Sequence, residues 1–124
     1  LHMAGWVEHA ALPAALASLD VLLNTSDNEG LPVSLIEAMA AGVPIVATRA
    51  GGTVSLIEDG VTGRVVRTGN SDAIARATLE TLTDRAMRER YASAARGAVH
   101  PRYDISTLVG TMEGFYTSLV AGNR

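Results

Sequence analysis

The sequence predicts an α/β fold built on a small parallel sheet of about three to four strands. Helices are expected to flank this sheet, and further helices to follow it at the C-terminal end. Short apolar runs alternate with helical patterns over the first two thirds of the chain, while the last third shows helical periodicity alone. Strands that alternate with helices favour right-handed strand–helix–strand units, which place neighbouring strands parallel.

Three short apolar runs bounded by turn residues are the predicted strands, at residues 20–26, 44–48 and 64–67. Near-continuous apolar runs of this length are typical of parallel strands buried on both faces, and we expect this of the first two. Residues 1–6 are interpreted as the tail of another strand, which ends in a loop at Gly5.

The helices between the strands show recognisable start and stop signals. Residues 12–19 carry Pro13 in their first turn, and residues 32–41 carry Pro32 at the expected first helical position and Gly42 at the end. Proline is tolerated at the start of a helix because that N–H has no partner there, and glycine suits the residue after the last turn. Residues 54–58 predict one further helical turn.

The C-terminal third predicts three helices: residues 71–82, capped by Asn70 or Ser71; residues 85–96; and a last helix capped by Asp104. Each has an apolar face at helical spacing, which we expect to pack in the core. The faces consist of Ile74, Thr78 or Leu79, and Leu82; Met87, Tyr91, and Ala94 or Ala95; and Leu108, Met112, Phe115 and Leu119.

Composition favours a single cytoplasmic domain. The chain has 124 residues, 48% of them hydrophobic, and a net charge of −3 without a basic block, so neither nucleic acid nor an anionic membrane is an expected partner. It has no cysteine and only three histidines, so we predict no metal site. Its apolar runs are shorter than the roughly 18 residues that indicate a membrane span.

Two loops are predicted to form one ligand-binding crevice, because ligands of parallel sheets bind beyond the carboxyl ends of the strands. Residues 25–31 follow one strand and residues 49–53 follow the next. The helix that begins near Pro32 directs free N–H groups and a positive dipole end into this crevice, which favours a phosphate. Leu31, Val33 and Ser34 are candidate donors; Pro32 lacks an N–H, and Gly30 lets the backbone approach a ligand closely.

Glu37 is the only charge between Gly30 and Thr48. With Leu35, Ile36 and Met39 on the core face, its carboxylate is expected at the crevice rim, where it can accept hydrogen bonds from a ribose diol. Glu29 would then lie farther along the same ligand.

Simpler interpretations of both acids remain. Glu37 could be an exposed helix residue, and Glu29 could merely favour the positive end of the helix. Ser26-x-x-Glu29 also matches a capping box, although Gly30 and Pro32 argue against a helix that starts at Ser26.

The run SDNEGLPVSLIEAMAAGVPIVATRAGG, followed by LIEDGVTGRVV, resembles the C-terminal domain of glycosyltransferase family 4, which has the GT-B fold with Rossmann-like domains. The family pattern sets two glutamates with seven residues between them inside E-G-x-P-x-x-x-x-E-A-M-A-x-G-x-P-V-V-A-T. The resemblance covers about residues 5–83. The matching residues are Glu29, Gly30, Pro32, Glu37, Ala38, Met39, Ala40, Gly42, Pro44, Ala47 and Thr48.

This resemblance implies retaining transfer of a sugar from a nucleotide-sugar (NDP-sugar) donor, with neither a cofactor nor a required metal. Glu29 would be the catalytic residue that contacts the donor sugar, and Glu37 would bind the ribose hydroxyls. The substrate-binding backbone would comprise Gly30, Leu31, Pro32, Val33 and Ser34.

The chain also departs from the family pattern. Family members open this domain with a strand followed by an arginine and a lysine that hold the diphosphate, yet the sequence contains no lysine. We therefore expect residues 1–124 to be one partial domain, the C-terminal donor-binding half of a GT-B enzyme, which is inactive without its N-terminal domain. In the family's strand order, 3-2-1-4-5-6, the strand at residues 20–26 would be the fourth. Its edge would be unpaired, which favours self-association.

Two other functions remain open. One is a non-catalytic nucleotide-binding or assembly module, and the other is a GT-B nucleotide-sugar epimerase. The Glu29/Glu37 pair within E-G-x-P favours the transferase over the epimerase.

Overall fold

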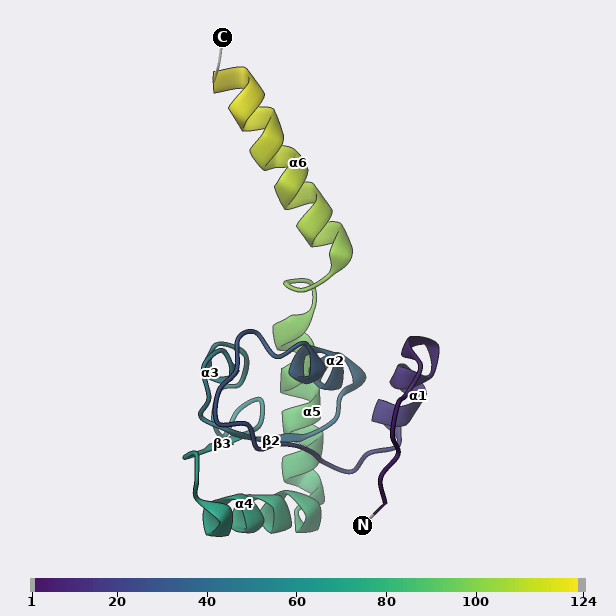
Figure 1. Cartoon of the computed structure of the whole chain (residues 1–124), viewed down its shortest axis with the longest axis vertical. Coiled ribbons are helices and arrows are strands. Elements are labelled where there is room, and N and C mark those ends of the chain that lie inside the picture. The colour runs from purple at the N-terminus through teal and green to yellow at the C-terminus, as the bar shows by residue number, and fades with distance from the viewer. Residues whose placement is uncertain (1, 123–124) are drawn as a thin grey trace.

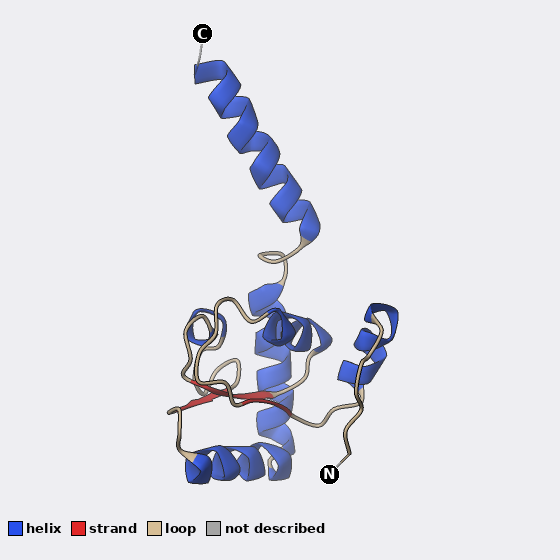
Figure 2. Cartoon of the chain, viewed as in Figure 1, coloured by secondary structure: helices blue, strands red, loops and turns tan. Residues whose placement is uncertain are grey.

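The computed structural model describes residues 2–122 and confirms the predicted α/β class. Its three-stranded parallel sheet has the order β1-β2-β3, with helices on both faces (Figures 1 and 2). The elements are η1 (His9–Ala11), α1 (Leu12–Ala17), β1 (Leu22–Asn24), α2 (Val33–Ala41), β2 (Ile45–Thr48), α3 (Thr53–Leu56), β3 (Arg64–Val66), α4 (Ser71–Thr83), α5 (Arg85–Val99) and α6 (Ile105–Gly122).

Successive side chains of β2 point to opposite faces of the sheet, and each face has its own core. Ile45 and Ala47 belong to the larger apolar cluster, to which α2 and α5 contribute. Val46 belongs to a smaller cluster, completed by Val66 of β3 and Ala77 of α4. All four residues of β2 are buried, as the sequence predicted, because β2 has a strand on each side and helices above and below.

The expectation that the first strand is buried on both faces is wrong. β1 is only three residues long, and Leu23 remains 49% exposed. β1 pairs with β2 in the register Leu22↔Ile45, and no second strand pairs with it among the described residues. The burial differs from that of β2 because β1 lies at the edge of the sheet.

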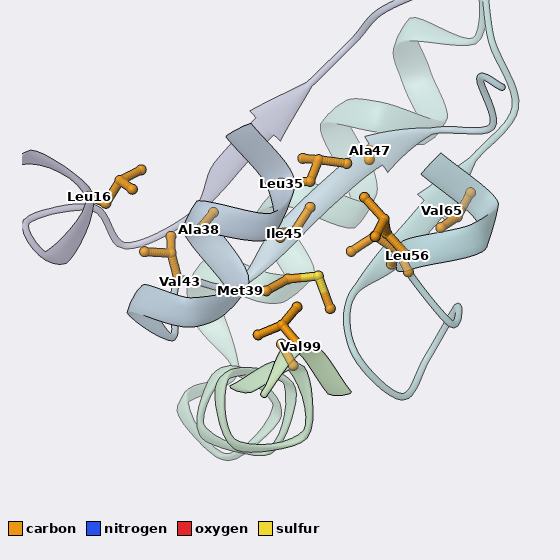
Figure 3. Close-up of a cluster of buried hydrophobic side chains, with 12 residues drawn as sticks. Leu16, Leu35, Ala38, Met39, Val43, Ile45, Ala47, Leu56, Val65 and Val99 are labelled. Atoms are coloured by element: carbon orange, nitrogen blue, oxygen red, sulfur yellow. The ribbon is translucent and has the colours of Figure 1, made fainter. Parts of the chain in front are cut away.

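Helix α2 supplies the centre of the larger core, where Leu35, Ala38 and Met39 are at most 1% exposed (Figure 3). It begins one residue later than expected, because Pro32 takes an extended ψ of 101° and acts as the N-cap. Gly42 ends the helix at φ 73°, a left-handed conformation in which its N–H donates to the Met39 carbonyl oxygen at 3.0 Å.

Helices α4 and α5 were predicted with nearly correct bounds, but the predicted apolar face of α4 is only partly right: Ile74 packs against the smaller cluster as expected, whereas two leucines do not. Asn70 Oδ1 accepts from the Ala73 N–H at 2.9 Å and caps α4. On α4 the buried residues are Ala77 and Thr81, whereas Leu79 is 61% exposed and Leu82 39% exposed. On α5 the buried face consists of Tyr91, Ala95 and Val99, close to the expectation.

Helix α6 overturns the expectation that its apolar stripe is part of the core. It projects away from the body of the molecule (Figure 1), and none of its residues is buried. The stripe residues Leu108, Met112, Phe115 and Leu119 are 42–56% exposed. The turn after α5 directs the helix outward, so no described surface lies against this face.

The expected strand tail at residues 1–6 is also absent from the part of the chain that the structure describes. Residues 2–8 have no regular structure, and Trp6 is 87% exposed. A strand needs a neighbour to satisfy its backbone, and no described strand pairs with this segment.

Candidate functional site

The two loops predicted to share a crevice are in direct contact at the carboxyl ends of β1 and β2. The Gly52 N–H donates to the Glu29 carbonyl oxygen at 3.2 Å. A Cβ on Gly51 would lie 1.8 Å from that same oxygen, and one on Gly52 would lie 1.7 Å from the Gly30 carbonyl oxygen. The pair therefore has a specific packing role, which the sequence alone did not indicate.

The Glu29 side chain is held by two donors from its own loop. Its Oε1 accepts from Ser26 Oγ at 2.6 Å and from Asn24 Nδ2 at 3.2 Å. The Ser26 N–H in turn donates to Asn24 Oδ1 at 3.2 Å. The Ser26 bond, followed by the Asn24 bond, lowers the pKa of Glu29 below its ordinary value, because both stabilise the ionised carboxylate. Glu29 is therefore an anion at neutral pH.

Ser26 and Glu29 thus interact without forming a helix, as Gly30 and Pro32 had indicated. The Ser-x-x-Glu spacing was the one sequence signal for this contact. Thr48, at the end of β2, holds the backbone of the loop that carries Glu29. Its hydroxyl donates to the Ser26 carbonyl oxygen and, at 3.4 Å, to the Asn24 carbonyl oxygen.

The start of α2 lies directly after this loop. The N–H groups of Leu35 and Ile36 donate to the Pro32 carbonyl oxygen at 3.1 and 3.4 Å. Those of Val33 and Ser34 belong to the first turn, where a helix provides no backbone acceptor. The side chains of Leu31 and Val33 are 53% and 60% exposed, so this end of the helix is open to a ligand.

Glu37 lies one helical turn beyond Val33 and is partly buried. It faces a hollow of about 380 Å³ between α1 and α2, which we call the α1–α2 hollow. The predicted neighbours of Glu37 behave as expected: Leu35 and Met39 are buried and Ile36 packs against the core. The hollow, which sequence reasoning missed, is lined by His9, Leu12, Pro13, Leu16, Glu37, Ala40 and Ala41.

Residues 2–122 contain no group of three or more histidine, aspartate or glutamate residues placed to bind a metal ion. No helix in this part of the chain has both the length and the apolar character needed to cross a bilayer.

Comparison with protein families gives a match over residues 1–98, to the family described as glycosyl transferases group 1. Among curated relatives, phosphatidyl-myo-inositol mannosyltransferase of Mycobacterium leprae is 35% identical over 116 residues, covering 93% of this chain and 31% of the relative. N-acetyl-alpha-D-glucosaminyl L-malate synthase of Bacillus anthracis is 29% identical over 109 residues, covering 88% and 29%. The chain thus spans about three tenths of each relative's length.

Solved structures agree with these matches. HepE of Anabaena in complex with UDP and glucose superposes with a TM-score of 0.81 at 30% identity, over 86% of this chain and 29% of HepE. Sucrose-phosphate synthase of Thermosynechococcus elongatus gives a TM-score of 0.89 at 26% identity, over 95% and 30%. The fold is therefore that of GT-B glycosyltransferase structures, and the chain belongs to the group 1 glycosyl transferase family.

Proposed function

We propose that this chain is the donor-binding part of a retaining glycosyltransferase of family 4, and that it binds an NDP-sugar along the start of α2. The observation that carries the proposal is the order of three kinds of group along residues 29–37. An anionic Glu29 precedes the open end of α2, and Glu37 follows one turn later beside the α1–α2 hollow. HepE of Anabaena, to which this chain is similar, has also been solved in complex with UDP-glucose, a ligand of this class.

Each part of an NDP-sugar has a matching group on this surface. The diphosphate fits the N–H groups of Val33 and Ser34, where the helix dipole is positive. The ribose diol pairs with the Glu37 carboxylate, which can only accept hydrogen bonds. The base enters the α1–α2 hollow, whose volume of about 380 Å³ is within the usual range of small-molecule sites. The sugar then extends over Gly30 toward Glu29.

The same surface suits the charges that develop during transfer. The bond between the sugar C1 and the diphosphate oxygen breaks, and the diphosphate leaves with the electron pair. In retaining transfer the acceptor hydroxyl oxygen forms its new bond to C1 on the face of the sugar that the diphosphate leaves, and the hydroxyl proton passes to the departing diphosphate oxygen. Negative charge grows at the first turn of α2, where N–H groups stabilise it, and positive charge on the ring lies near anionic Glu29.

The other two candidate functions have less support. This chain matches the glycosyl transferase group 1 family, and the relative from Mycobacterium leprae is named a mannosyltransferase, which favours a transferase over an epimerase. A non-catalytic nucleotide-binding module remains the second candidate, because the chain covers only about three tenths of its relatives. We propose that the acceptor is bound by a further domain, and that residues 1–124 alone transfer no sugar.

Calorimetric titration of the 124-residue chain with UDP, GDP, UDP-glucose and GDP-mannose tests donor binding. Glu37→Gln is expected to lower the affinity for the most tightly bound of these ligands roughly tenfold, since it removes the charge from the hydrogen bonds to the diol. Glu80→Gln on the exposed face of α4 is the matched control and should leave the affinity unchanged. Equal affinities for the Glu37→Gln variant and the unaltered chain would contradict the proposed placement of the ribose.

A further inference from the structure

The two oxygens of the Glu29 carboxylate differ in their hydrogen bonds. Both hydrogen bonds that the structure gives this side chain, from Ser26 Oγ and Asn24 Nδ2, end on Oε1. Within residues 2–122 no hydrogen bond ends on Oε2, so this oxygen can meet a ligand. A carboxylate held through one oxygen keeps its plane and direction, so the other oxygen points consistently.

We propose that Ser26 and Asn24 are positioning residues, which hold Glu29 through Oε1 so that Oε2 faces the donor sugar. This inference rests on the proposed function. Neither residue needs to touch the donor, because each acts through the Glu29 carboxylate.

The network around the two residues is built to resist movement. Asn24 accepts from the Ser26 N–H while it donates to Glu29, so its amide is used at both ends. The Thr48 hydroxyl holds the Ser26 carbonyl oxygen, and the Gly52 N–H holds the Glu29 carbonyl oxygen. Backbone and side chain of Glu29 are therefore fixed from separate directions, as a preorganised site requires.

The test compares Ser26→Ala, Ser26→Thr and Asn24→Asp in the 124-residue chain, with Ser55→Ala at an exposed position of α3 as the matched control. Carbon-detected NMR titration measures the pKa of Glu29, and calorimetry measures the affinity for UDP-glucose and GDP-mannose. Ser26→Ala removes the nearer donor, and Asn24→Asp replaces the amide donor with a like charge at almost constant shape. Both substitutions should raise the pKa of Glu29. Both should also lower the affinity for the more tightly bound of the two nucleotide-sugars roughly tenfold, as expected for loss of a charge-assisted hydrogen bond.

Ser26→Thr keeps the hydroxyl and should restore both quantities, while Ser55→Ala should change neither. An unchanged Glu29 pKa in both Ser26→Ala and Asn24→Asp would overturn the assignment of the hydrogen bonds. Glu29→Gln is measured alongside and should itself lower the affinity for the nucleotide-sugar. If it does, a raised Glu29 pKa without loss of affinity in the Ser26 and Asn24 variants would overturn the positioning role. If the unaltered chain binds neither donor, the proposed function fails and the donor-facing part of this inference fails with it, whereas the titration still decides the hydrogen bonds.

Discussion

Replacing Gly52 with alanine is the sharpest test of how the two loops form the site. The added Cβ would lie 1.7 Å from the Gly30 carbonyl oxygen, 2.8 Å from its carbon and 3.3 Å from the Leu31 Cα. Ordinary contact begins at 3.4 Å, and all three neighbours are backbone atoms that cannot rotate away. The φ of Gly52 is −66°, which alanine adopts freely, so the clash is the only source of destabilisation.

The loop that carries Glu29 and Gly30 must therefore move by more than 1 Å, and the hydrogen bond from the Gly52 N–H to Glu29 is expected to break. We expect a loss of about 1–3 kcal/mol in the free energy of unfolding, as for other overpacked sites. Donor affinity should fall by about tenfold or more, because a displacement of about 1 Å removes the alignment of Glu29 with the first turn of α2.

Urea unfolding and calorimetry measure the two effects. Gly97→Ala on the exposed face of α5 is the matched control, since its Cβ would meet nothing within 4 Å. Alanine in a helix interior should stabilise that variant by about 0.5–1 kcal/mol and leave donor binding unchanged. The reasoning is refuted if Gly52→Ala unfolds at the same urea concentration as the unaltered chain.

Two further predictions concern the outer parts of the fold. Removal of residues 105–122 should leave the melting temperature of the body within about 2 °C in circular dichroism, because α6 buries none of its residues; a fall of 10 °C would show that α6 supports the core. The exposed edge of β1 should cause self-association at micromolar concentration, which Leu23→Lys should reduce because a charge on an edge strand opposes pairing. Light scattering that gives the mass of one chain for the unaltered protein would contradict the second prediction.

The local sequence pattern was sufficient to predict those parts of the fold that depend mainly on neighbouring residues in the chain. The run at residues 44–48 predicted a strand buried on both faces, and β2 is buried at every position. Gly42 predicted the end of α2, and its φ of 73° explains why glycine suits that position. Because parallel strands end at the same edge of a sheet, the topology also predicted that the two site loops would meet, as the bond between Gly52 and Glu29 confirms.

Contacts between segments were decided by the tertiary structure. A stripe such as Leu108, Met112, Phe115 and Leu119 shows that one face of a helix is apolar, but periodicity does not say whether another element covers that face. The same holds for α4, where tertiary packing buries Ala77 and Thr81 and leaves Leu79 61% exposed.

Some features of the candidate site were likewise predictable from the sequence, and others depend on packing. The order Glu29, Gly30, Pro32 and Glu37 along the chain was enough to predict an open helix end between two acids. The bonds that orient the Glu29 carboxylate and the hollow beside Glu37 depend on how a loop closes on its neighbours and how α1 packs on α2. Helix and strand periodicity report short-range geometry, whereas these features arise from distances between segments that only packing determines.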